Sequence, residues 1–270
     1  MTIGTFDTNS EALAVRLELQ HRLSRFDLNQ WIFSHLPVDA GQSWLDLGCG
    51  RGEQTIPLAR GVGLEGKVTS VDLSAESLAQ VRRIAEQDGT ADRIELIHAN
   101  LDEISGALAG RTFDRAVGSY SLYYASDPEA LFETVARSLA PSGKLFFCGP
   151  SYANNRELRE MIAAARGEEE SLAPTRPARF MEELAPAACR RLFAGVQVVT
   201  FENPVAFPSE DELIAYWHSH NLFDPAADER FRALAAGSFA GGQPFINTKR
   251  GIGILAEDPR AESSAAQTRP

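Results

Sequence analysis

An acidic residue and three regularly spaced glycines form the stretch of this chain with the clearest chemical potential. Asp46 lies in an apolar run from Trp44 to Leu47, and Gly48, Gly50 and Gly52 follow at alternate positions. Glycine reaches positive φ and has no Cβ, so a ligand can approach its backbone closely. A carboxylate in an apolar strand needs a polar partner. A glycine turn between two core elements is the simpler interpretation, but the carboxylate favours a ligand site.

The elements around the glycines follow from the local sequence. An amphipathic run from Glu53 to Arg60 predicts a helix, and Pro57 is compatible with its first turn, where backbone NH groups have no intrahelical acceptor. A second strand is expected over 67–72 and ends in Asp72. Ligands of open parallel sheets bind outside the carboxyl ends of the strands, where a carboxylate can bind ribose hydroxyls. Ser74 is a good N-cap, so a capping role for this turn competes with a binding role.

The spacing Asp-x-Gly-x-Gly-x-Gly resembles motif I of the class I S-adenosylmethionine (SAM)-dependent methyltransferases, of the small-molecule, methyltransferase-11 or UbiE-like type. The resemblance implies SAM as cofactor, with Asp46 and the glycine backbone holding its methionine part and Asp72 its ribose. The dinucleotide pattern Gly-x-Gly-x-x-Gly fits less well, because the third glycine comes one residue too early.

Further strand ends extend the resemblance from about Trp44 to Pro150. Asn100 follows a third strand over 94–99, at a position where the family often has an Asp that meets the adenine amino group. An amide oxygen can accept the same hydrogen bond, and Asp102 is a nearby alternative. The cofactor-binding residues that the resemblance implies are Asp46, Gly48, Cys49, Gly50, Gly52, Asp72, Leu73, Asn100, Leu101 and Ser119.

The implied fold is α/β: a Rossmann-like, doubly wound seven-stranded sheet with an antiparallel last strand, plus N-terminal lid helices. We expect a helical lid over 1–40, a methyltransferase domain over 41–256 with a variable substrate-side segment at about 151–245, and a disordered tail over 257–270. The elements expected in the variable segment are helices over 154–165, 171–191 and 210–220, strands over 195–207 and 245–256, and a mobile loop over 167–178.

Catalytic residues are harder to assign than cofactor contacts. The methyl group of a sulfonium is already activated, so the protein's first task is to align the acceptor and exclude water. An acceptor hydroxyl can also need a general base, for which His is the usual residue near neutral pH. The candidates are His218, His220, Tyr123 and Tyr124, from two aromatic segments. We expect no metal site, because the His and acidic residues are scattered.

Composition limits the class of partner and the compartment. The net charge of -11 and the pI near 5.0 argue against nucleic acid, whose phosphates attract Lys and Arg. Three widely spaced cysteines indicate reduced thiols, and neither a signal segment nor a membrane span is recognisable. These features predict a cytoplasmic protein that binds a small molecule and no membrane, as a monomer or homodimer.

The sequence therefore predicts a SAM-dependent methyltransferase that acts on an oxygen or nitrogen of a small-molecule acceptor, with specialised metabolism as one setting. A noncatalytic SAM-binding protein and a Rossmann-type NAD(P) oxidoreductase are the alternatives. The acceptor, the methylated atom and the use of a base stay open at this point.

Overall fold

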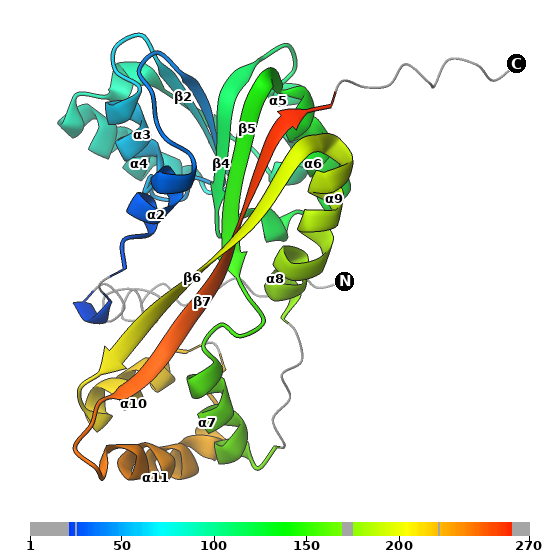
Figure 1. The fold of residues 1–270 in the computed structure, drawn as a ribbon. Helices are drawn as coiled ribbons and strands as arrows, with labels where there is room; N and C mark the ends of the chain where they lie inside the picture. The colour runs from blue at the N-terminus through cyan, green and yellow to red at the C-terminus, as the bar shows by residue number, and fades with distance from the viewer. Residues whose placement is uncertain (1–21, 25, 169–174, 221, 261–270) are drawn as a thin grey trace, which may run out of the picture. The chain divides into compact units, whose positions relative to one another are not determined.

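The computed structural model describes residues 22–24, 26–168, 175–220 and 222–260, which divide into two compact units (Figure 1). The sheet unit comprises 27–151, 175–201 and 251–260. The helical unit comprises 22–24, 26, 152–168, 202–220 and 222–250. Strands β6 (Phe193–Phe207) and β7 (Phe245–Pro259) contribute residues to both units.

A seven-stranded sheet has the order β3-β2-β1-β4-β5-β7-β6. Its other strands are β1 (Ser43–Leu47), β2 (Lys67–Asp72), β3 (Ile94–His98), β4 (Phe113–Ser119) and β5 (Leu139–Pro150). β1 to β5 pair in parallel, whereas β7 runs antiparallel to β5. The order reverses between β1 and β4, which makes their carboxyl ends the topological switch point. The predicted Rossmann-like sheet with an antiparallel last strand is thus confirmed.

Helices alternate with these strands. In the sheet unit they are α2 (Leu28–His35), α3 (Thr55–Gly61), α4 (Ala75–Asp88), α5 (Ile104–Ala107), α6 (Pro128–Arg137), α8 (Arg176–Arg179), a π-helical turn (Phe180–Leu184) and α9 (Ala185–Leu192). The N-cap predicted for α4 is confirmed, because Ser74 Oγ accepts from the Ser77 NH. Asp127 caps α6 in the same way, since its Oδ1 accepts from the Ala130 NH.

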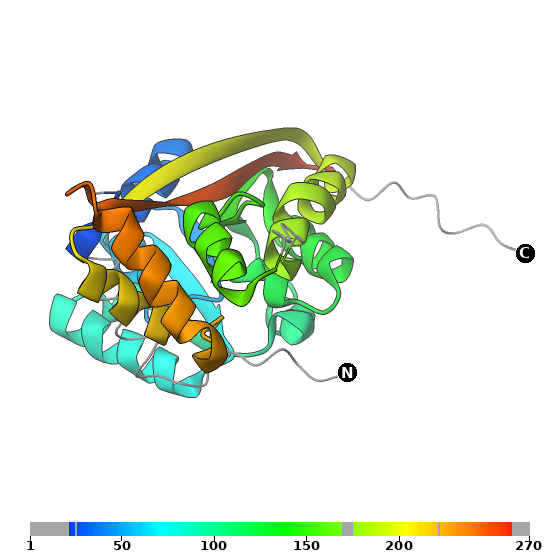
Figure 2. The same cartoon turned by 90° about the horizontal axis from the view of Figure 1, so that it is seen from below.

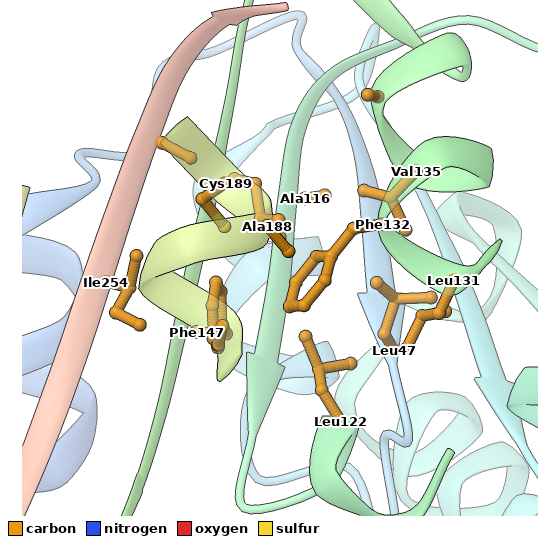
Figure 3. Packing of buried hydrophobic residues seen from close by; sticks show 14 of the residues in the cluster. Leu47, Ala116, Leu122, Leu131, Phe132, Val135, Phe147, Ala188, Cys189 and Ile254 are labelled. Carbon is orange, nitrogen blue, oxygen red and sulfur yellow. The ribbon is translucent and has the colours of Figure 1, made fainter. Parts of the chain in front are cut away.

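The sheet is covered on both faces because side chains alternate along each strand. On one face, Trp44 and Phe146 join a buried cluster with Ile32 of α2. On the other face, Phe147 packs against Phe132 of α6 with their ring centroids 5.2 Å apart (Figure 3). These two layers fix the positions of the strand ends.

The helical unit contains α7 (Arg156–Arg166), α10 (Glu210–Ser219) and α11 (Asp228–Phe239). α11 packs against both α7 and α10, as Figures 1 and 2 show from two directions. At its centre, the rings of Trp217 and Phe231 stack with centroids 4.6 Å apart. No helix is expected from the sequence at α11, in which only Phe231 and Ala235 are buried.

Several predicted boundaries shift in the structure. β7 continues to Pro259, three residues into the segment predicted as a disordered tail, because Glu257 pairs with Lys144 on β5. The part of that tail at 261–270, most of the predicted lid at 1–21 and the loop at 169–174 lie outside the described residues. α2 packs in the sheet unit through its buried Ile32. The lid over 1–40 stays a prediction.

Candidate functional site

The glycine loop joins β1 to α3 through a backbone that only glycine adopts readily. Gly48, Gly50 and Gly52 have φ values of 71°, 52° and 90°. A Cβ on Gly48 would collide with Ser121, and one on Gly52 would lie 3.1 Å from Val81 Cγ2. A Cβ on Gly50 would meet no atom within 4 Å, so the loop is open at this point. The outer two glycines therefore serve packing, and the middle one faces free space.

Asp46 lies beneath this loop and is only 1% exposed. Its Oδ2 accepts a hydrogen bond of 2.6 Å from Thr55 Oγ1, which is also 3.0 Å from Ser70 Oγ. Its Oδ1 is buried and has no hydrogen-bond partner among the described residues. Burial raises the pKa of the Asp46 carboxyl to about 7; the bond from Thr55 lowers it and the Asp72 charge raises it further. The unpartnered oxygen is suited to a cationic hydrogen-bond donor.

Asp72 connects the end of β2 to the glycine loop. Its Oδ2 accepts from the Gly50 NH at 2.7 Å, and its Oδ1 accepts from the Ser74 NH at 2.8 Å. Ser74 caps α4 with its own hydroxyl, so the cap does not depend on Asp72 alone. Each carboxylate oxygen can accept a second bond. The next residue, Leu73, is 58% exposed although it is large and apolar.

The residues after β3 form a turn that is closed by side chains. Asn100 Oδ1 accepts from the Asp102 NH at 3.2 Å. Asp102 is turned toward the loop before α6, because its carboxylate accepts from the Ser126 NH and hydroxyl at 2.8 and 2.6 Å. Leu101 is half-buried and packs on the core. Asn100 thus makes fewer hydrogen bonds through its side chain than Asp102 does.

The end of β4 completes this edge of the sheet. Ser119 Oγ lies 3.6 Å from Cys148 Sγ on β5. Ser121 Oγ donates to the Leu47 carbonyl oxygen at 2.5 Å, which seats the following 3-10 turn (Leu122–Tyr124) beside the glycine loop. Cys49 is buried in the glycine loop, and burial raises its thiol pKa far above the ordinary value. This thiol is therefore protonated at neutral pH.

The predicted cofactor-binding residues share one region. Asp46, Asp72, Asn100 and Ser119 stand at or just after the carboxyl ends of the adjacent strands β1, β2, β3 and β4. Within this region, Asp72 accepts from the Gly50 NH, and Ser121 packs closely against Gly48.

The four catalytic candidates are divided between the two units. Tyr123 and Tyr124 belong to the sheet unit, whereas His218 and His220 belong to the helical unit. His218 Nε2 lies 2.8 Å from Asp228 Oδ1, and Arg232 also binds this carboxylate. His220 Nδ1 accepts from the Leu222 NH at 3.1 Å.

Three polar residues of the site are not predicted from the sequence: Thr55, Ser70 and Ser121. Each hydroxyl is buried and bonds to a group on another element, 9, 15 and 74 positions away in the sequence. A hydroxyl residue in the apolar strand β2 was the available signal for Ser70. Within the described ranges, no three His, Cys, Asp or Glu side chains are grouped to hold a metal. Every helix that the structure describes is too short or too polar to span a bilayer.

Comparison with known proteins places this geometry in a family. Residues 45–143 match the family described as "Methyltransferase domain". This segment is a methyltransferase domain. It runs from β1 to the start of β5 and so contains the glycine loop, Asp72, Asn100 and the end of β4. The match covers the strand ends at which the candidate residues lie.

Two curated relatives each match a part of this chain. Aklanonic acid methyltransferase DauC of Streptomyces sp. (strain C5) is 29% identical over 112 residues, which are 42% of this chain and 50% of that protein. Demethylmenaquinone methyltransferase of Oceanobacillus iheyensis is 32% identical over 108 residues, which are 40% and 44% of the two chains. The chain thus spans about half the length of the curated relatives it matches.

A solved structure supports the fold over a longer stretch. A SAM-dependent methyltransferase from Aquifex aeolicus is 14% identical and has a TM-score of 0.53, with 92% of this chain and 98% of that chain covered. At this identity the likeness concerns the fold alone. The methyltransferase domain therefore has the class I fold that the sequence analysis predicted.

Proposed function

We propose that this chain is a SAM-dependent methyltransferase that transfers a methyl group to an oxygen or nitrogen of a small-molecule acceptor. The proposal is supported by the methyltransferase domain and by the two relatives, whose names give aklanonic acid and demethylmenaquinone as their substrates. The acidic charge of the chain disfavours nucleic acid as the acceptor.

The unpartnered Oδ1 of Asp46 is the observation that carries this proposal. A buried carboxylate oxygen without a donor costs free energy, and a cationic amino group would satisfy it. SAM has such a group on its methionine part. The room above Gly50 accommodates a ligand that lies against the backbone. The residues present therefore fit this cofactor.

The other strand ends supply contacts for the rest of SAM. We propose that Asp72 accepts from the ribose hydroxyls with its free lone pairs and that the exposed Leu73 packs beside the adenine. Asn100 accepts from the adenine amino group. The remaining contacts in this proposal come from Gly48, Cys49, Gly52, Leu101 and Ser119.

The chemistry that SAM supplies is a sulfonium-bound methyl group, already activated for displacement. The chain's own residues then bind, orient and exclude water. Burial holds the pKa of Tyr123 well above its ordinary value, so its phenol is a hydrogen-bond donor and no base at neutral pH. Tyr124, His218 and His220 remain our candidates for contacts to the acceptor or for proton removal.

We further propose that the protein works in the cytoplasm as a monomer or homodimer without a metal. The three cysteines are free and buried, as is usual in a reducing compartment.

Calorimetric titration with SAM, S-adenosylhomocysteine (SAH) and NADPH tests the cofactor. We expect micromolar binding of SAM and SAH, about -8 kcal/mol, and none of NADPH. Asp72→Asn should weaken SAH binding about tenfold, because it removes the charge from the ribose acceptor. The same substitution at Asp88, in a surface ion pair of the sheet unit, should change nothing. NADPH binding alone would favour the oxidoreductase alternative, and SAH binding without methyl transfer to any tested acceptor would favour the noncatalytic one.

A further inference from the structure

The loop that follows β4 lies where the strand order reverses. β4 is the neighbour of β1 in the sheet, and their carboxyl ends form the topological switch point. Ligands of open α/β sheets bind outside the strands at this point. Side chains that leave this loop are therefore well placed to contact a second ligand next to the cofactor.

The loop is held rigidly at both ends. Ser121 bonds to the Leu47 carbonyl oxygen and occupies the space in which a Gly48 Cβ would lie. Tyr120 has a φ of 55°, unusual for a residue with a side chain, and its NH donates to the Cys148 carbonyl oxygen at 2.9 Å. Such strain persists where the surroundings over-determine a conformation, often at functional sites. The 3-10 turn is thereby fixed against the glycine loop.

Two consecutive tyrosines on this turn have opposite environments. Tyr123 is 8% exposed and packs edge-on against Phe180, with ring centroids 6.4 Å apart. Tyr124 is 53% exposed. Their ring centroids lie 4.7 Å apart, and the ring planes are tilted by 55°.

The buried tyrosine thus orients the exposed one. The Tyr123 ring packs against Phe180, and it lies beside Gly149 together with the Met181 side chain. These neighbours hold the ring in place. An exposed aromatic ring that is already held in place loses little conformational entropy when a ligand stacks on it. Stacking against a flat π-face is favoured over contact with a saturated ring of the same size.

We propose that Tyr124 is the stacking contact for the acceptor, that Tyr123 is its positioning residue, and that the acceptor is a planar aromatic molecule with a hydroxyl or amino group. This inference rests on the proposed methyl transfer and narrows its substrate class. The Tyr124 ring provides the stacking face, and its hydroxyl provides a polar contact at the ring edge.

Binding of two matched probes to the SAH-loaded protein tests the acceptor class. The probes are 2-naphthol and its saturated counterpart 2-decalol, measured by calorimetry. We expect 2-naphthol to bind about tenfold more tightly, and Tyr124→Ala to remove this difference. Leu64→Ala, which truncates another exposed apolar side chain of the sheet unit, should leave it intact. Equal binding of both probes, or an unchanged preference in Tyr124→Ala, overturns the proposal.

A double-mutant cycle tests the positioning role. Tyr123→Leu removes the ring that packs against Tyr124 and should weaken 2-naphthol binding about threefold, with no further loss when Tyr124→Ala is already present. Additive losses would show that Tyr123 acts independently of Tyr124 and overturn its role. SAH affinity should stay unchanged in all these variants. Unchanged affinity also shows that the variants are folded. A wild-type protein that does not bind SAH would instead overturn the proposed function itself.

Discussion

Asp46 is a buried carboxyl group whose charge state changes near neutral pH. Its folded-state pKa of about 7 exceeds the ordinary value of 3.8, mainly because of burial. Between these pH values the folded chain retains a proton that the unfolded chain has lost. Stability contributed by this group is therefore complete below about pH 4 and falls as the pH rises to 7.

Asp46→Asn should remove this pH dependence. We expect the variant to gain stability over the wild type as the pH rises from 4 to 8, by at most about 4 kcal/mol, because the amide carries no charge to bury. Urea unfolding at both pH values measures the gain. As a second readout, SAH affinity of the wild type should fall about tenfold per pH unit below 7, and that of the variant should not. A pH-independent stability difference would contradict the buried-charge explanation.

Gly48 and Gly50 allow two reasons for a glycine to be told apart: the backbone conformation and the lack of space for a Cβ. Both have positive φ, but only at Gly48 would a Cβ collide with a neighbour, Ser121. We expect Gly50→Ala to cost about 1 kcal/mol of unfolding free energy from its backbone alone and Gly48→Ala several kcal/mol. Equal losses in urea unfolding would mean that Ser121 moves aside without cost.

At the scale of elements, an ion-pair network attaches the start of α7 to β7 within the helical unit. Arg250 donates to Glu157 at 2.7 Å and to Glu202 at 3.0 Å, and its NH donates to Asn154 Oδ1. The Thr248 NH also donates to Glu157 at 2.9 Å. Partial burial raises the pKa of Glu157, but the bonds from Arg250 and Thr248 lower it further, so that it lies below its ordinary value of 4.5.

Arg250→Met should destabilise the helical unit by about 1–3 kcal/mol at pH 7, because it leaves the carboxylate of Glu157 half-buried with fewer donors. This loss should shrink as the pH falls through the lowered pKa of Glu157, since the carboxyl then protonates in the wild type as well. Arg156→Met, in an exposed pair with Glu160 on the same helix, is the control and should cost less than about 0.5 kcal/mol. A similar loss in both variants would show that Arg250 acts as an ordinary surface charge.

The elements that the sequence predicts well are those with local causes. The β1 strand, the glycine turn and the N-cap Ser74 depend on residues a few positions apart, and the structure has them where expected. α11 was not predicted, because an Ala-rich helix with two buried residues shows little hydrophobic periodicity in its sequence. The polar groups around Asp46 were not predicted for another reason: Thr55 bonds to Asp46 and Ser70 bonds to Thr55 from two other elements, and only packing brings them together.

At the scale of the whole molecule, the division into two units could not be predicted, because each unit combines segments that are far apart in the sequence. The expected variable segment at 151–245 contains most of the helical unit, but residues 175–201 belong to the sheet unit. All proposed cofactor contacts lie in the sheet unit. A ligand at these contacts should therefore stabilise the two units unequally.

Hydrogen exchange with and without SAH measures this inequality. At about 100 times Kd, SAH should stabilise the sheet unit by about 2.7 kcal/mol and slow exchange of the amides in β1, β2 and the glycine loop. Amides of α7, α10 and α11 serve as the internal control and should exchange at unchanged rates. Equal slowing in both units would contradict a cofactor site confined to the sheet unit.

The rates at which the three cysteines react can report local opening of the structure around each of them. Cys49 lies in the glycine loop, Cys148 in β5 and Cys189 in α9, and all three are buried with raised thiol pKa values. Because alkylating reagents attack the exposed thiolate, the closed protein should resist them and each sulfur should react only when its own surroundings part. The order in which the three become modified therefore reads out which layer of the sheet unit loosens first.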